Sequence, residues 1–327
     1  MTVKDDQSEL PFETTADVDV TRWDQVVHFA DVWVTSPARI VWDDFRTRVG
    51  LIILSVYALM GTVGVLFYPV PRLNAGPRLV GPFENFEYIL GTTATGQDLL
   101  GLMIHSTPFM LNMVIAGAVF TSTMSVVVGT LAGYKRGRTD QILMGLSDIA
   151  LVIPGLPLVI VLAIAIQPEN PLVVGVLLTI NGWAGLARSV RSEVISLRNE
   201  AYIEASSIMG LSTSSIILKD ILPNIMPYVL INFMQAGRNV IFASVGLYYL
   251  GLLPFSGLNW GVVLNTAQKS GALNGFHALH WIVVPIVTIS ALVFGLVYFS
   301  QGLDRIFNPR IRARHSKTME SDSPEDV

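Results

Sequence analysis

The sequence contains no cysteine, so it forms neither a disulfide framework nor a thiolate metal site. Charge is also scarce: 14% of the 327 residues are Asp, Glu, Lys or Arg, against about 25% in a soluble domain. Only His277 and His280 are close enough in sequence to share a metal, and an interfacial position is the simpler expectation for them. The first 35 residues are polar and acidic, so we expect no cleavable signal peptide. No nucleophile–base or nucleic-acid motif stands out, and we expect no metal, catalytic site or nucleic-acid partner.

Hydrophobic residues, in contrast, make up 51% of the chain and gather in long blocks. The mean hydropathy is +0.54. A bilayer core about 30 Å thick requires roughly 20 apolar residues of helix. We therefore predict an all-α polytopic membrane protein with six transmembrane helices, at about residues 50–68, 110–131, 141–166, 171–187, 225–253 and 281–303.

Lys and Arg concentrate in the N-terminal segment, after the second and fourth spans, and in the C-terminal tail. Cytoplasmic loops carry an excess of these residues, so we expect both termini in the cytoplasm. The predicted domains are a disordered acidic arm, an interfacial segment, a transmembrane domain and a cytoplasmic tail, at 1–35, 36–49, 50–303 and 304–327. The interfacial segment is either a short helix, with Trp42 and Phe45 toward lipid, or an ordinary basic flank of the first span.

The third span contains Pro154 and Pro157, which remove backbone donors inside a helix and should kink it. Such a kink serves either as a hinge or as a passive bend.

The predicted cytoplasmic loop 188–224 is long and carries strong helix punctuation. We predict one helix over 190–209, ended by Gly210, because glycine adopts the left-handed conformation at little cost. Ser212 is placed as the N-cap of a second helix, which stops at Pro223. Two short helices joined at a glycine corner suit the transmission of motion from a partner; the alternative is a mere connector between spans.

Within this loop, Glu204-Ala205-Ser206, then Gly210 after three residues, then Ile221-Leu222-Pro223 after ten more, resemble the EAA signature of the permeases of ATP-binding-cassette (ABC) importers. The upstream SEVISLRNEAYIEAS is similar to the oligopeptide and dipeptide branch. Further matches to this branch run in order over about residues 36–312, and the short stretch between the first two spans resembles the shorter, C-type permease. Ser206 replaces an alanine of the signature, a change between small residues. Gln97 and Thr93 also depart from the branch's pattern, which weakens inference about the external loop.

The resemblance implies a plasma-membrane permease subunit that forms half of the path for a peptide-like or oligosaccharide solute. The implied partners are a second homologous permease in a heterodimer, two cytoplasmic ATPase subunits, an external solute-binding protein and membrane lipid. The chain itself would hold no cofactor, because ATP and Mg would bind to the ATPase subunits.

In such a permease the loop docks in a groove of the ATPase dimer. Glu204 would contact the ATPase surface, Gly210 would form the corner, and Leu211, Ile216 and Ile217 would fill apolar positions in or beneath the joint. The residues expected to take part in coupling are Glu200, Glu204, Ala205, Ser206, Gly210, Leu211, Ile216, Ile217, Leu222 and Pro223.

Residues 91–98 nearly spell the phosphate-binding pattern GxxxxGK[ST]. Gln97 lacks the required charge, Asp98 would repel phosphate, and the topology places the segment outside. We therefore expect no nucleotide site in this chain and no enzymatic activity of its own.

Arg238 lies inside the fifth predicted span, where an arginine costs about 2.5–3.5 kcal/mol on insertion scales. It either lines the translocation path and meets a polar or anionic solute, or forms a structural pair with an acid such as Asp148; a misplaced span would remove the cost. The candidate path residues are Asn232, Gln235, Arg238 and Asn239.

The sequence gives less support to two other functions. An ion-coupled secondary transporter would use acids at the middle of the membrane and paired broken helices, and Asp148 is the only such acid that the sequence suggests. An intramembrane enzyme finds no catalytic constellation to support it.

Overall fold

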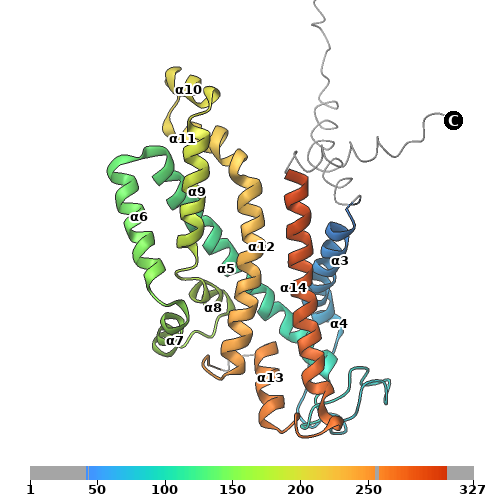
Figure 1. The fold of residues 1–327 in the computed structure, drawn as a ribbon. Helices are drawn as coiled ribbons and strands as arrows, with labels where there is room; N and C mark the ends of the chain where they lie inside the picture. The colour runs from blue at the N-terminus through green and yellow to red at the C-terminus, as the bar shows by residue number, and fades with distance from the viewer. Residues whose placement is uncertain (1–41, 43, 255–257, 308–327) are drawn as a thin grey trace, which may run out of the picture.

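The structure is a computed structural model that describes residue 42 and residues 44–254 and 258–307. Regular structure in these residues is helical, apart from one isolated bridge between Thr92 and Asp98. The helices form an elongated bundle (Figure 1), from which α10 (Ala201–Ile208) projects at one end, while α13 (Trp260–Lys269) lies at the other. The predicted arm 1–35, half of the interfacial segment 36–49 and most of the tail lie outside the described residues.

Within the described residues, four segments are long and apolar enough to cross a membrane. The first is Phe45–Phe67, made of α3 (Phe45–Leu59), a π-turn (Met60–Gly64) and α4 (Val65–Phe67), and the second is α5 (Leu99–Lys135). The third is Thr213–Tyr249, made of α11 (Thr213–Ile216), a π-turn (Ile217–Ile221) and α12 (Leu222–Tyr249), and the fourth is His280–Asp304 within α14 (His280–Phe307). Two bent helix pairs raise the number to as many as six. These are α6 (Gly137–Val152) with α7 (Gly155–Ile166), and α8 (Pro171–Leu178) with α9 (Trp183–Arg198). The predicted fold class is confirmed, although α5 begins well before residue 110.

The third predicted span is broken rather than kinked, because α6 and α7 meet at 84°. Pro154 caps α7 and Pro157 lies in its first turn, where a missing N–H leaves no helical bond unmade. The Asn181 side chain donates to the carbonyls of Ala150 and Ile153, 3.4 and 3.1 Å away, and so satisfies the end of α6. The prolines thus start a new helix.

The fourth predicted span, 171–187, is not one straight helix either. α8 ends at Leu178 and α9 begins at Trp183, with a 64° bend between them. No proline lies in the intervening turn. The turn is held from α5, because the Ser125 hydroxyl donates to the Trp183 carbonyl at 2.9 Å.

Glycines allow the helices around α5 to approach at backbone distance. A Cβ added to Gly175 of α8 would lie 2.2 Å from the carbonyl oxygen of Met113 on α5, and one added to Gly117 of α5 would lie 2.7 Å from the Gly175 carbonyl oxygen. Small residues at such crossings are the usual means of close helix packing in membranes. The α5–α8 contact therefore has no room for a side chain at either position.

Candidate functional site

The predicted coupling loop forms a helical corner at one end of the bundle (Figure 1), but its helices differ from the prediction. The single helix expected over 190–209 is interrupted at Asn199, between α9 and α10. The second helix does not stop at Pro223. It continues from α11 through the π-turn into α12, and Pro223 occupies the first turn of α12, where its missing N–H is tolerated.

The corner between α10 and α11 is a glycine-capped turn, as predicted. Gly210 has φ +78°, its N–H donates to the Ser207 carbonyl, and the next N–H donates to the Ser206 carbonyl. These two bonds define a Schellman motif, which ends a helix with a left-handed residue. Ser212 caps the second helix by accepting from the Ser215 N–H at 3.3 Å, so that prediction is also confirmed.

A small apolar cluster lies beneath the corner and joins it to the ends of α9 and α12. Ile203 of α10 and Ile216 of α11 are buried in it, and Ile217 and Leu222 pack against it. The other buried members are Val190, Val194, Ile221, Ile225 and Val229. Ile216 and Ile217 thus lie beneath the joint as expected. Leu211 does not: it follows the left-handed glycine and is exposed.

The outer surface of the corner combines acidic and apolar side chains. Glu200, Glu204 and Ala205 are exposed, and Ser206 is buried. Around them the corner exposes large apolar side chains that a lone chain in water would bury: Ile208 (79% exposed), Met209 (72%), Leu211 and Leu218. Ile208 and Met209 were not anticipated from the sequence, although apolar residues directly before a helix-ending glycine are a usable signal.

A hollow of about 380 Å³ lies beside α10. Tyr134, Arg198 and Glu204 line it, and the Arg198 guanidinium stacks 5.7 Å from the centre of the Tyr134 ring. Partial burial and the neighbouring Glu200 and Asp220 raise the pKa of the Tyr202 hydroxyl, also on α10. The corner therefore presents acidic, basic and apolar groups together, and protein–protein interfaces typically combine an apolar core with a polar rim.

Two ion pairs fix α9, which leads into the corner, against α6. The Arg191 guanidinium donates to both carboxylate oxygens of Asp140, at 2.5 and 2.6 Å, and Arg188 pairs with Asp148. Bidentate arginine–carboxylate pairs hold both distance and orientation. The suggested pair between Arg238 and Asp148 is wrong, because Asp148 is held by Arg188.

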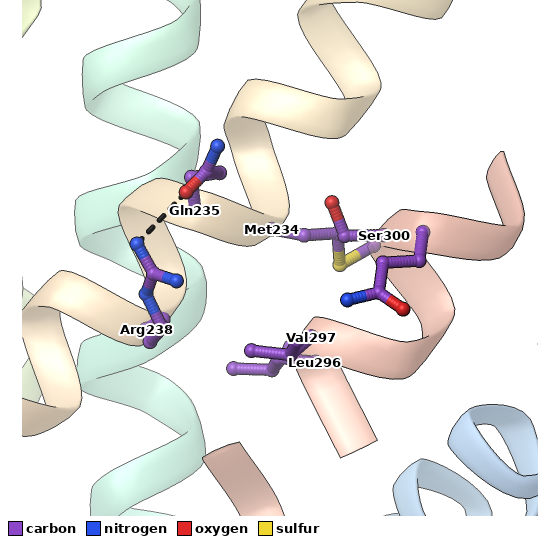
Figure 2. Close-up of a pocket in the computed structure, with 7 residues that line it drawn as sticks. Met234, Gln235, Arg238, Leu296, Val297 and Ser300 are labelled. Carbon is purple, nitrogen blue, oxygen red and sulfur yellow. Dashed lines mark hydrogen bonds between the residues drawn. The ribbon is translucent and has the colours of Figure 1, made fainter. Parts of the chain in front are cut away.

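The four candidate path residues lie on α12 and form a polar stripe. Asn232 donates to the Tyr228 carbonyl at 2.8 Å, Gln235 and Asn239 are exposed, and Arg238 is half-buried. Figure 2 shows the Arg238 guanidinium directed at the Gln235 oxygen, 2.8 Å away. Polar groups at membrane depth require protein or water around them, so this stripe is unsuited to lipid.

Residues 91–98, which resemble a phosphate-binding loop, instead lead into α5 and supply its N-cap. The Asp98 carboxylate caps that helix by accepting from the N–H groups of Leu100 and Gly101, at 3.2 and 2.9 Å. The Tyr68 hydroxyl donates to the same carboxylate at 2.6 Å. Partial burial and Asp98 raise the pKa of Tyr68. A carboxylate already occupies the amide donors that a phosphate would need.

Residues 125–313 match the family model described as "Binding-protein-dependent transport system inner membrane component". The chain is 29% identical over 282 residues to the oligopeptide transport system permease protein OppC of Bacillus subtilis, which covers 83% of this chain and 90% of the relative. It is 30% identical over 270 residues to the dipeptide transport system permease protein DppC of the same organism, an alignment that covers 80% of this chain and 81% of the relative. It is also 27% identical over 305 residues to the glutathione transport system permease protein GsiD of Pectobacterium atrosepticum, an alignment that covers 86% of this chain and 94% of the relative.

Proposed function

This chain belongs to the family of inner-membrane components of binding-protein-dependent transport systems, and from that premise we propose that its α10–α11 corner receives the motion of a separate ATPase. The chain is a permease subunit of an ABC importer and a multi-pass protein of the plasma membrane.

The observation that carries the proposal is the continuity of the corner with a membrane span. α11, the π-turn and α12 form one apolar segment, Thr213–Tyr249. The buried cluster around Ile216 ties α10 to the base of this segment. A partner that displaces α10 therefore tilts α12 directly, while the ion pairs between α6 and α9 hold the neighbouring helix. Glu204 and the exposed apolar side chains around it supply the contact surface.

The polar stripe of α12 supports a second permease and a path between the two. Gln235 and Asn239 are exposed on a membrane-spanning helix, and neither is compatible with lipid. A second, homologous permease that faces this stripe would enclose it with water, and the two α12 helices would line the path. We propose a heterodimer, since the resemblance is to the shorter of two different permeases.

ATP and Mg bind, in this proposal, to two cytoplasmic ATPase subunits rather than to this chain. The use of Asp98 as a helix cap supports that assignment for the phosphate-like segment. This chain contributes movement and a path, and no catalytic or cofactor site.

The solute we propose is a peptide, delivered by an external binding protein. Relatives are named as permeases for oligopeptides, dipeptides and glutathione, which favours a peptide over the oligosaccharide considered from the sequence. The end of the bundle opposite the corner, with α13, would face the binding protein (Figure 1).

Reconstitution tests the proposal. The chain would be co-purified with its second permease, ATPase and binding protein, and placed in liposomes. We expect a peptide-loaded binding protein to stimulate ATP hydrolysis and ATP-dependent uptake, with unloaded and oligosaccharide-supplied binding protein as controls. Uptake driven by an ion gradient without ATP would favour the secondary transporter instead.

A further inference from the structure

The cavity between α12 and α14 carries a positive charge at membrane depth. It has a volume of about 150 Å³. Met234, Gln235 and Arg238 of α12 face Leu296, Val297 and Ser300 of α14 across it (Figure 2). Arg238 is its only ionisable lining residue among the described ones, and an arginine stays protonated in proteins.

No carboxylate of the described residues forms an ion pair with this guanidinium. Asp148 and Asp140 are held by Arg188 and Arg191. The bond that Arg238 makes is to the neutral amide of Gln235. Among the described residues, the cavity's cation therefore has no carboxylate as counter-charge, in a place where an unpaired charge is costly.

The remaining polar groups also suit an anion. Gln301 lines the cavity and its amide oxygen already accepts from Arg46 at 3.1 Å, which leaves its NH₂ as a donor. Ser300 adds a hydroxyl. A guanidinium offers two parallel donors that match one carboxylate. The cavity is smaller than the roughly 300–1,000 Å³ typical of whole-ligand pockets, so it fits an end group, and Leu296 and Val297 provide an apolar wall beside it.

We propose that this cavity is a carboxylate-binding station, in which Arg238 receives the C-terminal carboxylate of a peptide in transit. This inference rests on the proposed function. Gln235 makes binding of the carboxylate reversible. Its amide oxygen accepts from the Arg238 guanidinium when no peptide is present, and it competes with the carboxylate for the same donors. A transport site must bind well enough to admit its solute and weakly enough to release it.

The test compares a peptide with its C-terminal amide in the reconstituted complex. Arg238→Gln should lower ATP-dependent uptake of the free acid on the order of tenfold and leave uptake of the amide close to the wild-type value. Arg238→Lys keeps the charge but loses the two parallel donors of the guanidinium, so its uptake of the free acid should lie between those of the wild type and Arg238→Gln. The matched control is Asn239→Ala on the same stripe, which should affect acid and amide equally.

Equal losses for acid and amide in Arg238→Gln, or no loss for either, would overturn the station. A peptide amide with an internal glutamate separates the sources of the carboxylate: if its uptake also falls in the variant, the assignment to the C-terminus is wrong. Binding-protein-stimulated ATP hydrolysis must persist in Arg238→Gln; its absence from the wild-type complex would instead refute the proposed function.

A measurement without ATP distinguishes failure of the carboxylate station from failure of the proposed ATP-driven function. Thermal unfolding of the purified permease pair would be followed with millimolar N-acetylphenylalanine and with its amide. We expect a higher Tm with the acid only, and no difference in Arg238→Gln. The same Tm with acid and amide in the wild-type protein would contradict the station whatever the source of energy.

Discussion

Replacing Gly210 by valine should reduce coupled uptake on the order of tenfold or more, while the protein still inserts in the membrane. Gly210 has φ +78°, a conformation that costs a residue with a side chain about 1–2 kcal/mol and a β-branched residue more. An added Cβ meets no atom within 4 Å, so the substitution strains the corner without disturbing the bundle. Since about 1.4 kcal/mol corresponds to a factor of ten, this strain is large enough to displace α10 from its docking position. Uptake and ATP hydrolysis would be measured together, with membrane levels by immunoblot.

Gly210→Asn is the matched control. Asparagine tolerates the left-handed conformation better than other residues with side chains, so this variant should keep most of the coupled uptake. Full uptake by Gly210→Val at normal membrane levels would show that the left-handed corner is dispensable for coupling.

Gly175→Val should sharply reduce the amount of folded protein. The new Cβ would lie 2.2 Å from the Met113 carbonyl oxygen and 2.9 Å from the Met113 Cα, and backbone atoms cannot move without separating α8 from α5. Overpacking of flexible cores already costs about 1–3 kcal/mol, and a clash with backbone is less easily relieved. We expect little monodisperse protein by size-exclusion chromatography of detergent extracts.

Gly145→Val controls for the change in residue type. Gly145 also lies inside a helix, α6, but a Cβ there meets nothing within 4 Å. It should leave the elution profile unchanged. A normal profile for Gly175→Val would mean that α5 and α8 are not in backbone contact.

The spans could be predicted because length and apolar composition are local properties of the sequence. The break at Pro154 had a local signal too, although proline alone does not distinguish a kink from a new helix. The break after Leu178 had none, because its turn is held by Ser125 of α5, a residue far away in the sequence.

The corner shows the same division. Gly210 and Ser212 were identified correctly because each acts through its own backbone conformation or cap. Sequence periodicity did not reveal the interruption at Asn199 or the continuity of α11 with α12, where the buried cluster joins residues far apart in the chain. Leu211, expected in or beneath the joint, is exposed directly after the left-handed Gly210.

The proposed Arg238–Asp148 pair failed for a similar reason. Arg238 does lie in a candidate span and Asp148 in the bent pair α6–α7, but the choice of partner depends on how the helices are rotated. Arg188 and Arg191 lie one turn apart on α9 and face Asp148 and Asp140 on α6. The polar stripe of α12 was predictable from residue type and spacing, whereas the cavity beside it required α14 to be placed.

Thiol cross-linking from the α10 corner would show whether an ATPase drives this permease there. Because the chain has no cysteine, Ile208→Cys, at a side chain 79% exposed, introduces a single reactive group. Its control is Phe276→Cys, at a side chain 92% exposed between α13 and α14. We expect Ile208→Cys to cross-link to the ATPase subunit and to react with an impermeant maleimide only from the cytoplasmic side, and Phe276→Cys to react only from outside. Labelling of Ile208→Cys from outside, or no cross-link in a complex that hydrolyses ATP and transports, would contradict coupling through the corner.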